Sequence, residues 1–236
     1  MSADEVVIVT GVGGNLGTAV AELLAARGSQ LVLVERTAAN LAATMDRLPR
    51  RERHLAMPGV ELTDAAAAGT VCAEALARFG RIDGLAHTVG SFAMADIDAA
   101  DPAHWEGLYR ANLLTTLSMC RAVAPHMRAA GRGAIVTIGA TAAAARAAKG
   151  MAAYAAAKSA VLRLTESLAD ELKSVGVRAN CVLPSIIDTP QNRAAMPKAD
   201  TSRWVRPVQI AEVIAFLLSD AASGVTGAAI PVTGRG

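Results

Sequence analysis

Four consecutive β-branched residues, Val6-Val7-Ile8-Val9, run directly into a glycine-rich segment, and this junction constrains the fold more than any other feature. Continuous β-branched runs are typical of strands buried on both faces of a parallel sheet. The turn at residues 10–17 leads into a helical pattern from about residue 18 to residue 27, which Gly28 ends. In such a unit, glycines let the backbone approach a pyrophosphate while the helix N-terminus supplies amide donors. The segment therefore predicts a nucleotide-binding site.

Strand-like and helical segments alternate along the rest of the chain. Further strands are expected at residues 30–34, within 54–62, and at 82–89, 134–140, 177–183 and 228–232. Helices are expected at residues 37–48, 65–79 behind a Thr63-Asp64 cap, 150–175 and 207–218. This alternation predicts an α/β fold, in which one Rossmann-like, doubly wound parallel sheet carries helices on both faces. We expect residues 1–236 to form a single domain.

Charge and cysteine content exclude several classes of protein. The net charge is +2 with acidic and basic residues interspersed, so we expect neither a nucleic-acid nor a membrane partner. No apolar run reaches membrane-spanning length, and the acidic N-terminus does not resemble a secretory signal. Cys72, Cys120 and Cys181 are isolated, which predicts no disulfide framework, no metal site and a reducing, cytoplasmic location.

Tyr154 and Lys158 stand four residues apart in an alanine-rich stretch. Such a stretch is strongly helical, so the two side chains should share one face. A phenol ionises near pH ~10, and an adjacent ammonium would lower that pKa and make the phenol a usable acid and base. Taken alone, the pair favours a packed tyrosine and a solvated lysine, because helices often carry such pairs by accident.

The end of the second expected strand bears on the choice of dinucleotide. Glu35 can accept hydrogen bonds from adenosine ribose hydroxyls and would repel a 2′-phosphate, which favours NAD. Arg36 argues the other way, because a guanidinium there could hold the phosphate. On balance we predict NAD(H) over NADP(H).

Over nearly its whole length the chain resembles the short-chain dehydrogenase/reductase family. Thr10-Gly11-x-x-x-Asn15-Leu16-Gly17 resembles the family's TGxxxGxG turn, with Asn15 in place of a glycine. Tyr154-x-x-x-Lys158 resembles its catalytic pair, and Asn112 matches the asparagine that distorts a helix and holds a water in the proton relay. In such enzymes a nicotinamide exchanges hydride with substrate while the tyrosine exchanges a proton and the lysine binds the nicotinamide ribose.

The resemblance extends to further cofactor contacts. Glu61-Leu62 stands where the family has an adenine-contacting aspartate, and the segment from His87 to Gly90 replaces its NNAG; His87 itself is interpreted as structural. Residues 184–189 resemble PGxxxT, which grips the carboxamide, with Ser185 for the glycine. The cofactor-binding residues implied are Gly11, Gly13, Asn15, Leu16, Gly17, Glu35, Arg36, Glu61, Leu62, Val89, Gly90, Tyr154, Lys158, Pro184, Ile187 and Thr189.

The main departure from the family lies upstream of Tyr154. Where the fifth strand usually ends in a serine that bonds the reacting oxygen, this chain has Ala140, and Thr141 falls near the serine's usual offset from the tyrosine. Such a bond is worth about 3 kcal/mol, so either Thr141 replaces the serine or the substrate is already activated. The candidate catalytic residues are thus Tyr154, Lys158, Asn112 and Thr141.

Dihydropteridine reductases lack that serine, and the chain resembles this branch at Gly150-Met151-x-x-Tyr154 and over residues 188–204. We therefore predict a small activated substrate, with a quinonoid dihydropterin as the narrower prediction. The alternatives are a general carbonyl or alcohol substrate with Thr141 in the serine's role, and a non-catalytic NAD-binding sensor or scaffold. Residues 190–204 are expected to form a mobile lid. Subunit contacts in the family imply a homodimer or homotetramer.

Overall fold

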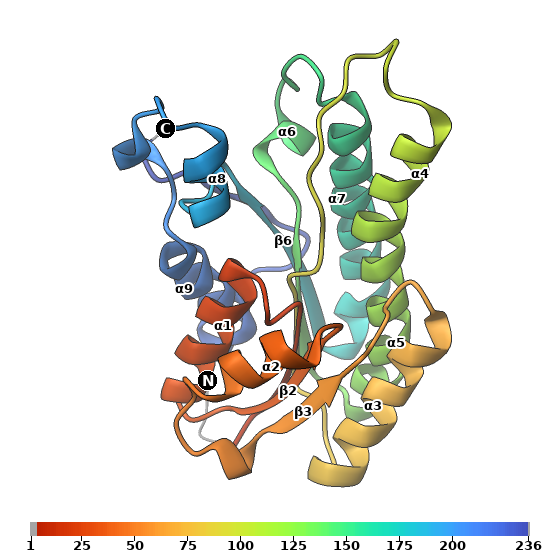
Figure 1. The fold of residues 1–236 in the computed structure, drawn as a ribbon. Helices are drawn as coiled ribbons and strands as arrows, with labels where there is room; N and C mark the ends of the chain where they lie inside the picture. The colour runs from red at the N-terminus through yellow and green to blue at the C-terminus, as the bar shows by residue number, and fades with distance from the viewer. Residues whose placement is uncertain (1–3, 236) are drawn as a thin grey trace.

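Seven parallel strands form one sheet at the centre of the computed structural model, which describes residues 4–235 apart from the side chain of Ala65 (Figure 1). The strand order is β3-β2-β1-β4-β5-β6-β7, so the chain reverses its direction of winding between β1 and β4. This confirms the predicted α/β, doubly wound architecture. The strands are β1 (Val6–Thr10), β2 (Gln30–Glu35), β3 (Leu55–Pro58), β4 (Gly84–His87), β5 (Gly133–Ile138), β6 (Val177–Pro184) and β7 (Ala229–Val232).

Helices cover both faces of the sheet, as Figure 1 shows. One face is covered by α1 (Asn15–Ala26), α2 (Ala38–Met45) and α9 (Pro207–Leu218). The other is covered by α3 (Ala65–Phe79), α5 (Thr115–Ala130) and α7 (Ala152–Leu172), with α4 (Pro102–Tyr109) against α7. Two short helices, α6 (Thr141–Ala144) and α8 (Pro190–Ala195), lie beyond the carboxyl ends of the strands.

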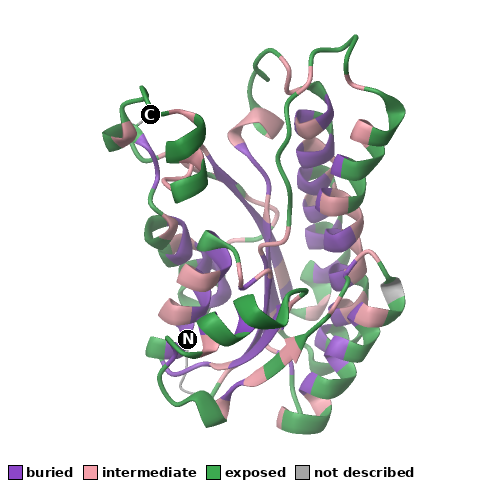
Figure 2. Ribbon diagram, viewed as in Figure 1, coloured by how far each residue is buried: buried purple, intermediate pink, exposed green. Residues whose placement is uncertain are grey.

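The uninterrupted apolar run of β1 is explained by burial on both sides. Val7 and Val9 pack into the cluster beneath α1 and α9, whereas Val6 and Ile8 pack into the cluster beneath α3 and α5. In Figure 2 the central strands are accordingly almost wholly buried. Alternate side chains of a strand point to opposite faces, so a strand between two helical layers needs apolar residues at every position.

Several element boundaries differ from the sequence-based expectation. Helix α1 begins at Asn15 instead of residue 18, because Gly11 takes a positive φ of +71° and Gly14 is already extended at the N-cap. The turn is therefore shorter than expected. Helices α4 and α5 were not predicted, although Asp101 caps α4 by accepting a 2.8 Å hydrogen bond from the His104 amide.

Between α4 and α5 the chain forms a π-helical turn, Arg110–Leu114, with Asn112 at its centre. The expected distortion of the helix at Asn112 is confirmed. Such turns are rare and concentrate at functional sites.

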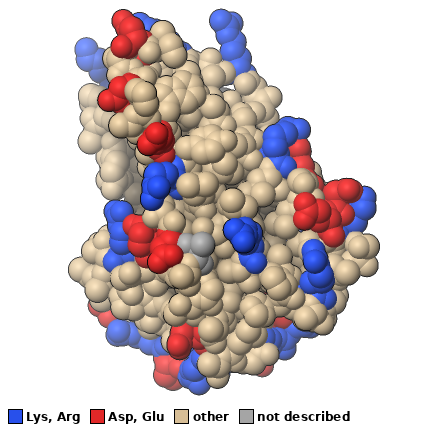
Figure 3. Space-filling model, turned by 90° about the vertical axis from the view of Figure 1, so that its right-hand side faces the viewer, with Lys and Arg blue, Asp and Glu red and all other residues tan. Residues whose placement is uncertain are grey.

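The surface carries no dominant charge on the face drawn in Figure 3, where acidic and basic groups are scattered over a largely uncharged surface. None of the helices within residues 4–235 is both long and apolar enough to cross a membrane.

Candidate active site

A cleft of about 480 Å³ opens at the carboxyl ends of the strands, beside the point where the sheet changes its winding direction. Open α/β sheets bind ligands in such crevices. The predicted cofactor residues that line this cleft are Gly11, Glu35, Arg36, Glu61, Leu62, Val89 and Gly90.

The glycine turn at one edge of the cleft has no room for a side chain at Gly13 or Gly17. A Cβ on Gly17 would lie 2.1 Å from the carbonyl oxygen of Gly11, and one on Gly13 would lie 2.6 Å from the Cβ of Asn40. The backbone is thus exposed at the N-terminus of α1, where Leu16 is buried and anchors the first helical turn. A bare backbone at a helix N-terminus fits a pyrophosphate.

Glu35 stands between this turn and the end of β2. Its carboxylate accepts hydrogen bonds from the Gly13 amide at 2.9 Å and the Thr37 amide at 3.1 Å. These two bonds fix the carboxylate beside the turn, where the ribose of a dinucleotide held by the turn would lie.

Arg36 and Glu61 face each other at the same end of the cleft, with Nη1 of Arg36 3.7 Å from Oε2 of Glu61. Glu61 also accepts hydrogen bonds from Thr63, at 3.1 Å from the amide and 3.0 Å from the hydroxyl. The hydrogen bond from the Thr63 backbone amide is the main cause of the lowered pKa of Glu61. Both predicted residues therefore border the cleft, and there they form an ion pair with each other.

Lys158 reaches from α7 to the end of β5, where its Nζ donates a 2.8 Å hydrogen bond to the Ile138 carbonyl. Only 5% of the residue is exposed, and this burial lowers the pKa of Lys158 to about 8. A Cβ on Gly90 would lie 3.2 Å from Nζ. Gly90 also lines the cleft, so the lysine and the dinucleotide cleft meet at this residue.

Tyr154 lies one helical turn before Lys158, half-buried, with the ring of Phe92 packed edge-to-face at 4.9 Å between centroids. Burial raises the pKa of Tyr154 to about 12. The prediction that Lys158 lowers this pKa is therefore wrong in direction. Burial disfavours the phenolate, and the lysine ammonium is hydrogen-bonded to Ile138.

Asn112 clamps the segment that follows β4. Its Oδ1 accepts a 3.2 Å hydrogen bond from the Ser91 amide, and its Nδ2 donates to the carbonyls of Ser91 at 3.0 Å and Leu108 at 2.9 Å. The side chain is fully buried. The contacts seen are structural, and the predicted role in a proton relay stays a prediction.

His87 is confirmed as a structural residue of β4. It is buried, with Nδ1 2.9 Å from the Thr10 hydroxyl and Nε2 3.3 Å from the Thr115 hydroxyl. Burial is the main cause that lowers the pKa of His87 to about 3. The ring is therefore neutral at physiological pH.

Ala140, which occupies the serine's position by strand alignment, and Thr141, the candidate for the serine's role, are consecutive residues after β5. Ala140 is buried at the N-cap of α6, and Thr141 begins this short helix, half-buried. Ser159 of α7 donates a 3.1 Å hydrogen bond to the Ala143 carbonyl, which holds α6 against the helix that carries Tyr154. Whether Thr141 contacts substrate stays a prediction.

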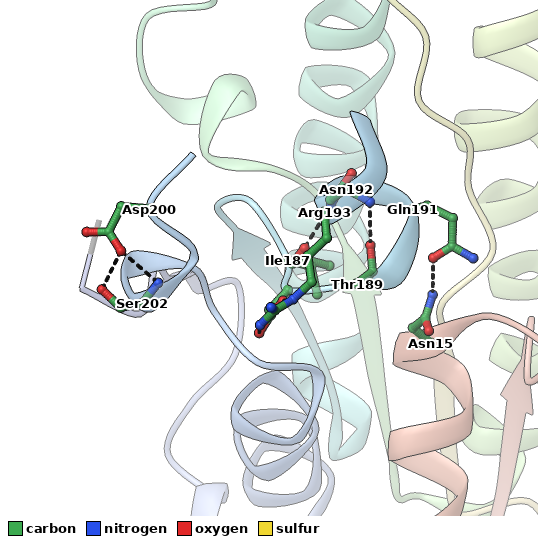
Figure 4. A network of polar contacts seen from close by, with 9 residues as sticks. Asn15, Ile187, Thr189, Gln191, Asn192, Arg193, Asp200 and Ser202 are labelled. Carbon is green, nitrogen blue, oxygen red and sulfur yellow. Dashed lines mark hydrogen bonds and ion pairs between the residues drawn. The ribbon is translucent and has the colours of Figure 1, made fainter. Parts of the chain in front are cut away.

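The segment after β6 is tied together by polar contacts (Figure 4). Thr189 caps α8 by accepting a 3.1 Å hydrogen bond from the Asn192 amide, and Nδ2 of Asn192 donates to the Ile187 carbonyl at 2.8 Å. Asn15 donates a 2.9 Å hydrogen bond to Oε1 of Gln191, which joins α8 to the glycine turn. This part of the expected lid is thus folded and attached, with Pro184 ending β6 beneath it.

Phe92 and Gln191 were not predicted from the sequence. An aromatic residue two positions after Gly90 was the available signal for Phe92 in a chain with three phenylalanines. No sequence signal indicated Gln191, because its hydrogen-bond partner, Asn15, lies 176 residues away in the chain.

A family model described as short chain dehydrogenase matches residues 5–200. Cis-4-hydroxycyclohexanecarboxylate dehydrogenase of Sinomonas cyclohexanicum is 35% identical over 243 residues, covering 98% of this chain and 96% of the relative. The crystal structure of levodione reductase is similar, with a TM-score of 0.91, 29% identity and coverage of 99% and 98% of the two chains. The structure of NAD⁺-bound xylitol dehydrogenase has a TM-score of 0.87, 25% identity and coverage of 99% and 100%. None of these names mentions a pterin, so the expected resemblance to dihydropteridine reductases gains no support from them.

Proposed function

The chain belongs to the short-chain dehydrogenase/reductase family, and from this we propose that it reduces the carbonyl group of a small substrate with NADH, reversibly, with Tyr154 as the proton donor. Membership of the family establishes that the chain is an NAD(P)-dependent oxidoreductase of small carbonyl or alcohol substrates. The roles of individual residues are our proposal.

One observation carries the proposal: the dinucleotide cleft and Lys158, one helical turn after Tyr154 on α7, meet at Gly90. This residue lines the cleft, and a Cβ on it would lie beside both Nζ of Lys158 and Oδ1 of Asn112. A glycine is needed there, because a Cβ would lie 2.7 Å from that Oδ1. An acid and a hydride carrier must act on adjacent atoms of one substrate, so this convergence is what the reaction requires.

When bound, a nicotinamide dinucleotide would supply the hydride. Tyr154 would supply the proton, because a phenol whose pKa is raised to about 12 stays protonated at neutral pH and can donate to a developing alkoxide. Lys158 is mostly charged at pH 7 with a pKa of about 8, and it offers its remaining N–H groups to a ribose. Phe92 packs edge-to-face against the ring of Tyr154.

A quinonoid dihydropterin is a second candidate substrate, and one observation favours it. Ala140 offers no hydroxyl at the end of β5, and an electron-poor substrate would need none. Thr141→Ala separates the two. A rate loss of about 100-fold on ketones supports a carbonyl substrate with Thr141 in the serine's role, and an unchanged rate on dihydropterin supports the activated substrate.

The test is a titration with NADH and NADPH followed by turnover measurements on cyclic ketones, sugar-derived ketones and quinonoid dihydropterin. Turnover of a ketone with NADH supports the proposed reaction, whereas turnover of quinonoid dihydropterin alone supports the second candidate. Tight dinucleotide binding without turnover across the panel would favour the non-catalytic sensor or scaffold.

We also infer a homodimer or homotetramer. Ala152 and Ala156 are exposed one turn apart on α7, a pattern that permits close approach of a second helix. Light scattering coupled to size exclusion measures the subunit number, and a monomer at micromolar concentration would contradict the inference.

A further inference from the structure

Arg36 and Glu61 come from neighbouring strand ends and meet at one end of the cleft. Arg36 directly follows β2, and Glu61 lies three residues after β3, the strand paired with β2. Their side chains are 3.7 Å apart, with 76% of the Arg36 side chain and 50% of the Glu61 side chain exposed. Considered alone, Arg36 would be a ligand for a ribose 2′-phosphate, so its partner decides whether it is free to act as one.

We propose that Glu61 is a specificity-determining residue, which weakens binding of the 2′-phosphorylated dinucleotide by holding Arg36 as its counterion. This rests on the dinucleotide-binding function proposed above and concerns only which of the two dinucleotides the cleft selects.

Glu61 is the fixed member of the pair. Both hydrogen bonds from Thr63 end on its Oε1, which leaves Oε2 directed at Arg36. Arg36 has a long, mostly exposed side chain, and its guanidinium forms an ion pair with Glu61. The anion is therefore positioned in advance, and the guanidinium is drawn to it.

Glu35 adds a second carboxylate at this end of the cleft and is itself committed to the amides of Gly13 and Thr37. A 2′-phosphate would bring close to two negative charges into this region. It would have to displace Glu61 from Arg36 and then lie near two carboxylates. The ribose hydroxyls of NADH meet no such obstacle, because they can donate hydrogen bonds to Glu35.

A second guanidinium also borders the cleft. Arg110 lines it from the π-helical turn and is the competing candidate for a phosphate ligand. The experiment must therefore separate the two arginines.

The test measures dissociation constants of NADH and NADPH by fluorescence titration for the wild type, Glu61→Gln and Arg36→Ala, and for the double variants Glu61→Gln/Arg36→Ala and Glu61→Gln/Arg110→Ala. Glutamine keeps the Oε1 that accepts both Thr63 bonds and removes only the charge. We expect Glu61→Gln to bind NADPH about fivefold more tightly, the scale of an exposed ion pair, and NADH within about twofold of the wild type. In the Arg36→Ala background the gain for NADPH should vanish.

A matched control is Glu212→Gln, because Glu212 on α9 is also 50% exposed and ion-paired, with Arg27. It changes the net charge equally and should leave both dissociation constants unchanged. An equal gain in Glu212→Gln, a gain that persists without Arg36, or a gain lost only in Glu61→Gln/Arg110→Ala would overturn the proposal. A wild type that binds neither dinucleotide would instead overturn the proposed function.

Discussion

Nζ of Lys158 lies 2.8 Å from the carbonyl oxygen of Ile138, inside the molecule at the end of β5. One bond to a neutral carbonyl does not replace the hydration of an ammonium, and the pKa of Lys158 is lowered to about 8 in consequence. The site thus contains a cation that is costly to bury. Its ammonium lies next to Gly90 at the dinucleotide cleft, where a bound dinucleotide could accept hydrogen bonds from it.

This cost should appear in the pH dependence of stability. Because the folded pKa of about 8 lies below the ordinary 10.5, the unfolded chain binds more protons between these pH values, and stability rises with pH across that window. We expect the wild type to gain up to about 3 kcal/mol over Lys158→Met from pH 8 to pH 10.5. Urea unfolding at a series of pH values measures this. Parallel stability–pH curves for the two proteins would show that folding does not lower the pKa of Lys158.

His87 should make the chain sensitive to acid. The pKa of His87 in the folded protein is about 3, below the ordinary 6.5. Below pH 6.5 the unfolded chain therefore binds a proton at His87 that the folded chain does not bind. Stability should fall by up to about 1.4 kcal/mol per pH unit as the pH drops from about 6 to about 4. His87→Asn should flatten this slope, while the contribution of His54, whose pKa is also lowered by burial, remains in both proteins. An equally steep acid limb in the variant would count against the assignment.

Replacing Gly17 or Gly69 by alanine should change the free energy of unfolding in opposite directions. In Gly17→Ala the new Cβ would lie 2.1 Å from the Gly11 carbonyl oxygen, and we expect a loss of about 3 kcal/mol together with weaker dinucleotide binding. At Gly69, inside α3, no atom of the described residues outside the adjoining helix backbone and the two neighbouring residues lies within 4 Å of the position that a Cβ would take, so Gly69→Ala should gain about 0.5–1 kcal/mol. Thermal unfolding of both variants checks the pair, and a shift of the same sign in both would contradict the geometry of the turn.

The Asn15–Gln191 hydrogen bond should restrain α8 against the glycine turn. The bond is exposed, so its loss in Gln191→Ala should cost about 0.5–1 kcal/mol and speed amide exchange in residues 190–204 by about threefold. Gln191→Glu keeps the acceptor oxygen and should exchange like the wild type. Hydrogen–deuterium exchange followed by mass spectrometry measures both, and identical exchange in all three proteins would mean that the bond does not restrain the segment.

Local features of the sequence predicted the sheet and the placement of the main site residues. The β-branched run of β1 indicated burial on both faces, and the spacing of Tyr154 and Lys158 placed them one turn apart on one helix. Both signals lie within a few residues of chain, where periodicity determines which side chains share a face.

Features that depend on distant contacts were not predictable. The direction of the Tyr154 pKa shift depends on burial, which tertiary packing determines. The state of Arg36 likewise depends on Glu61, which the next strand brings opposite it. A sequence shows which groups are present, whereas their partners are determined by tertiary packing.

The most direct test of the account is the pre-steady-state rate of NADH oxidation by a ketone substrate in Tyr154→Phe, with the NADH dissociation constant measured on the same protein. Phenylalanine keeps the ring that packs against Phe92 and removes only the proton donor. We predict a rate at least about 100-fold lower and an NADH dissociation constant within about twofold of the wild type. An undiminished rate would contradict the claim that Tyr154 supplies the proton.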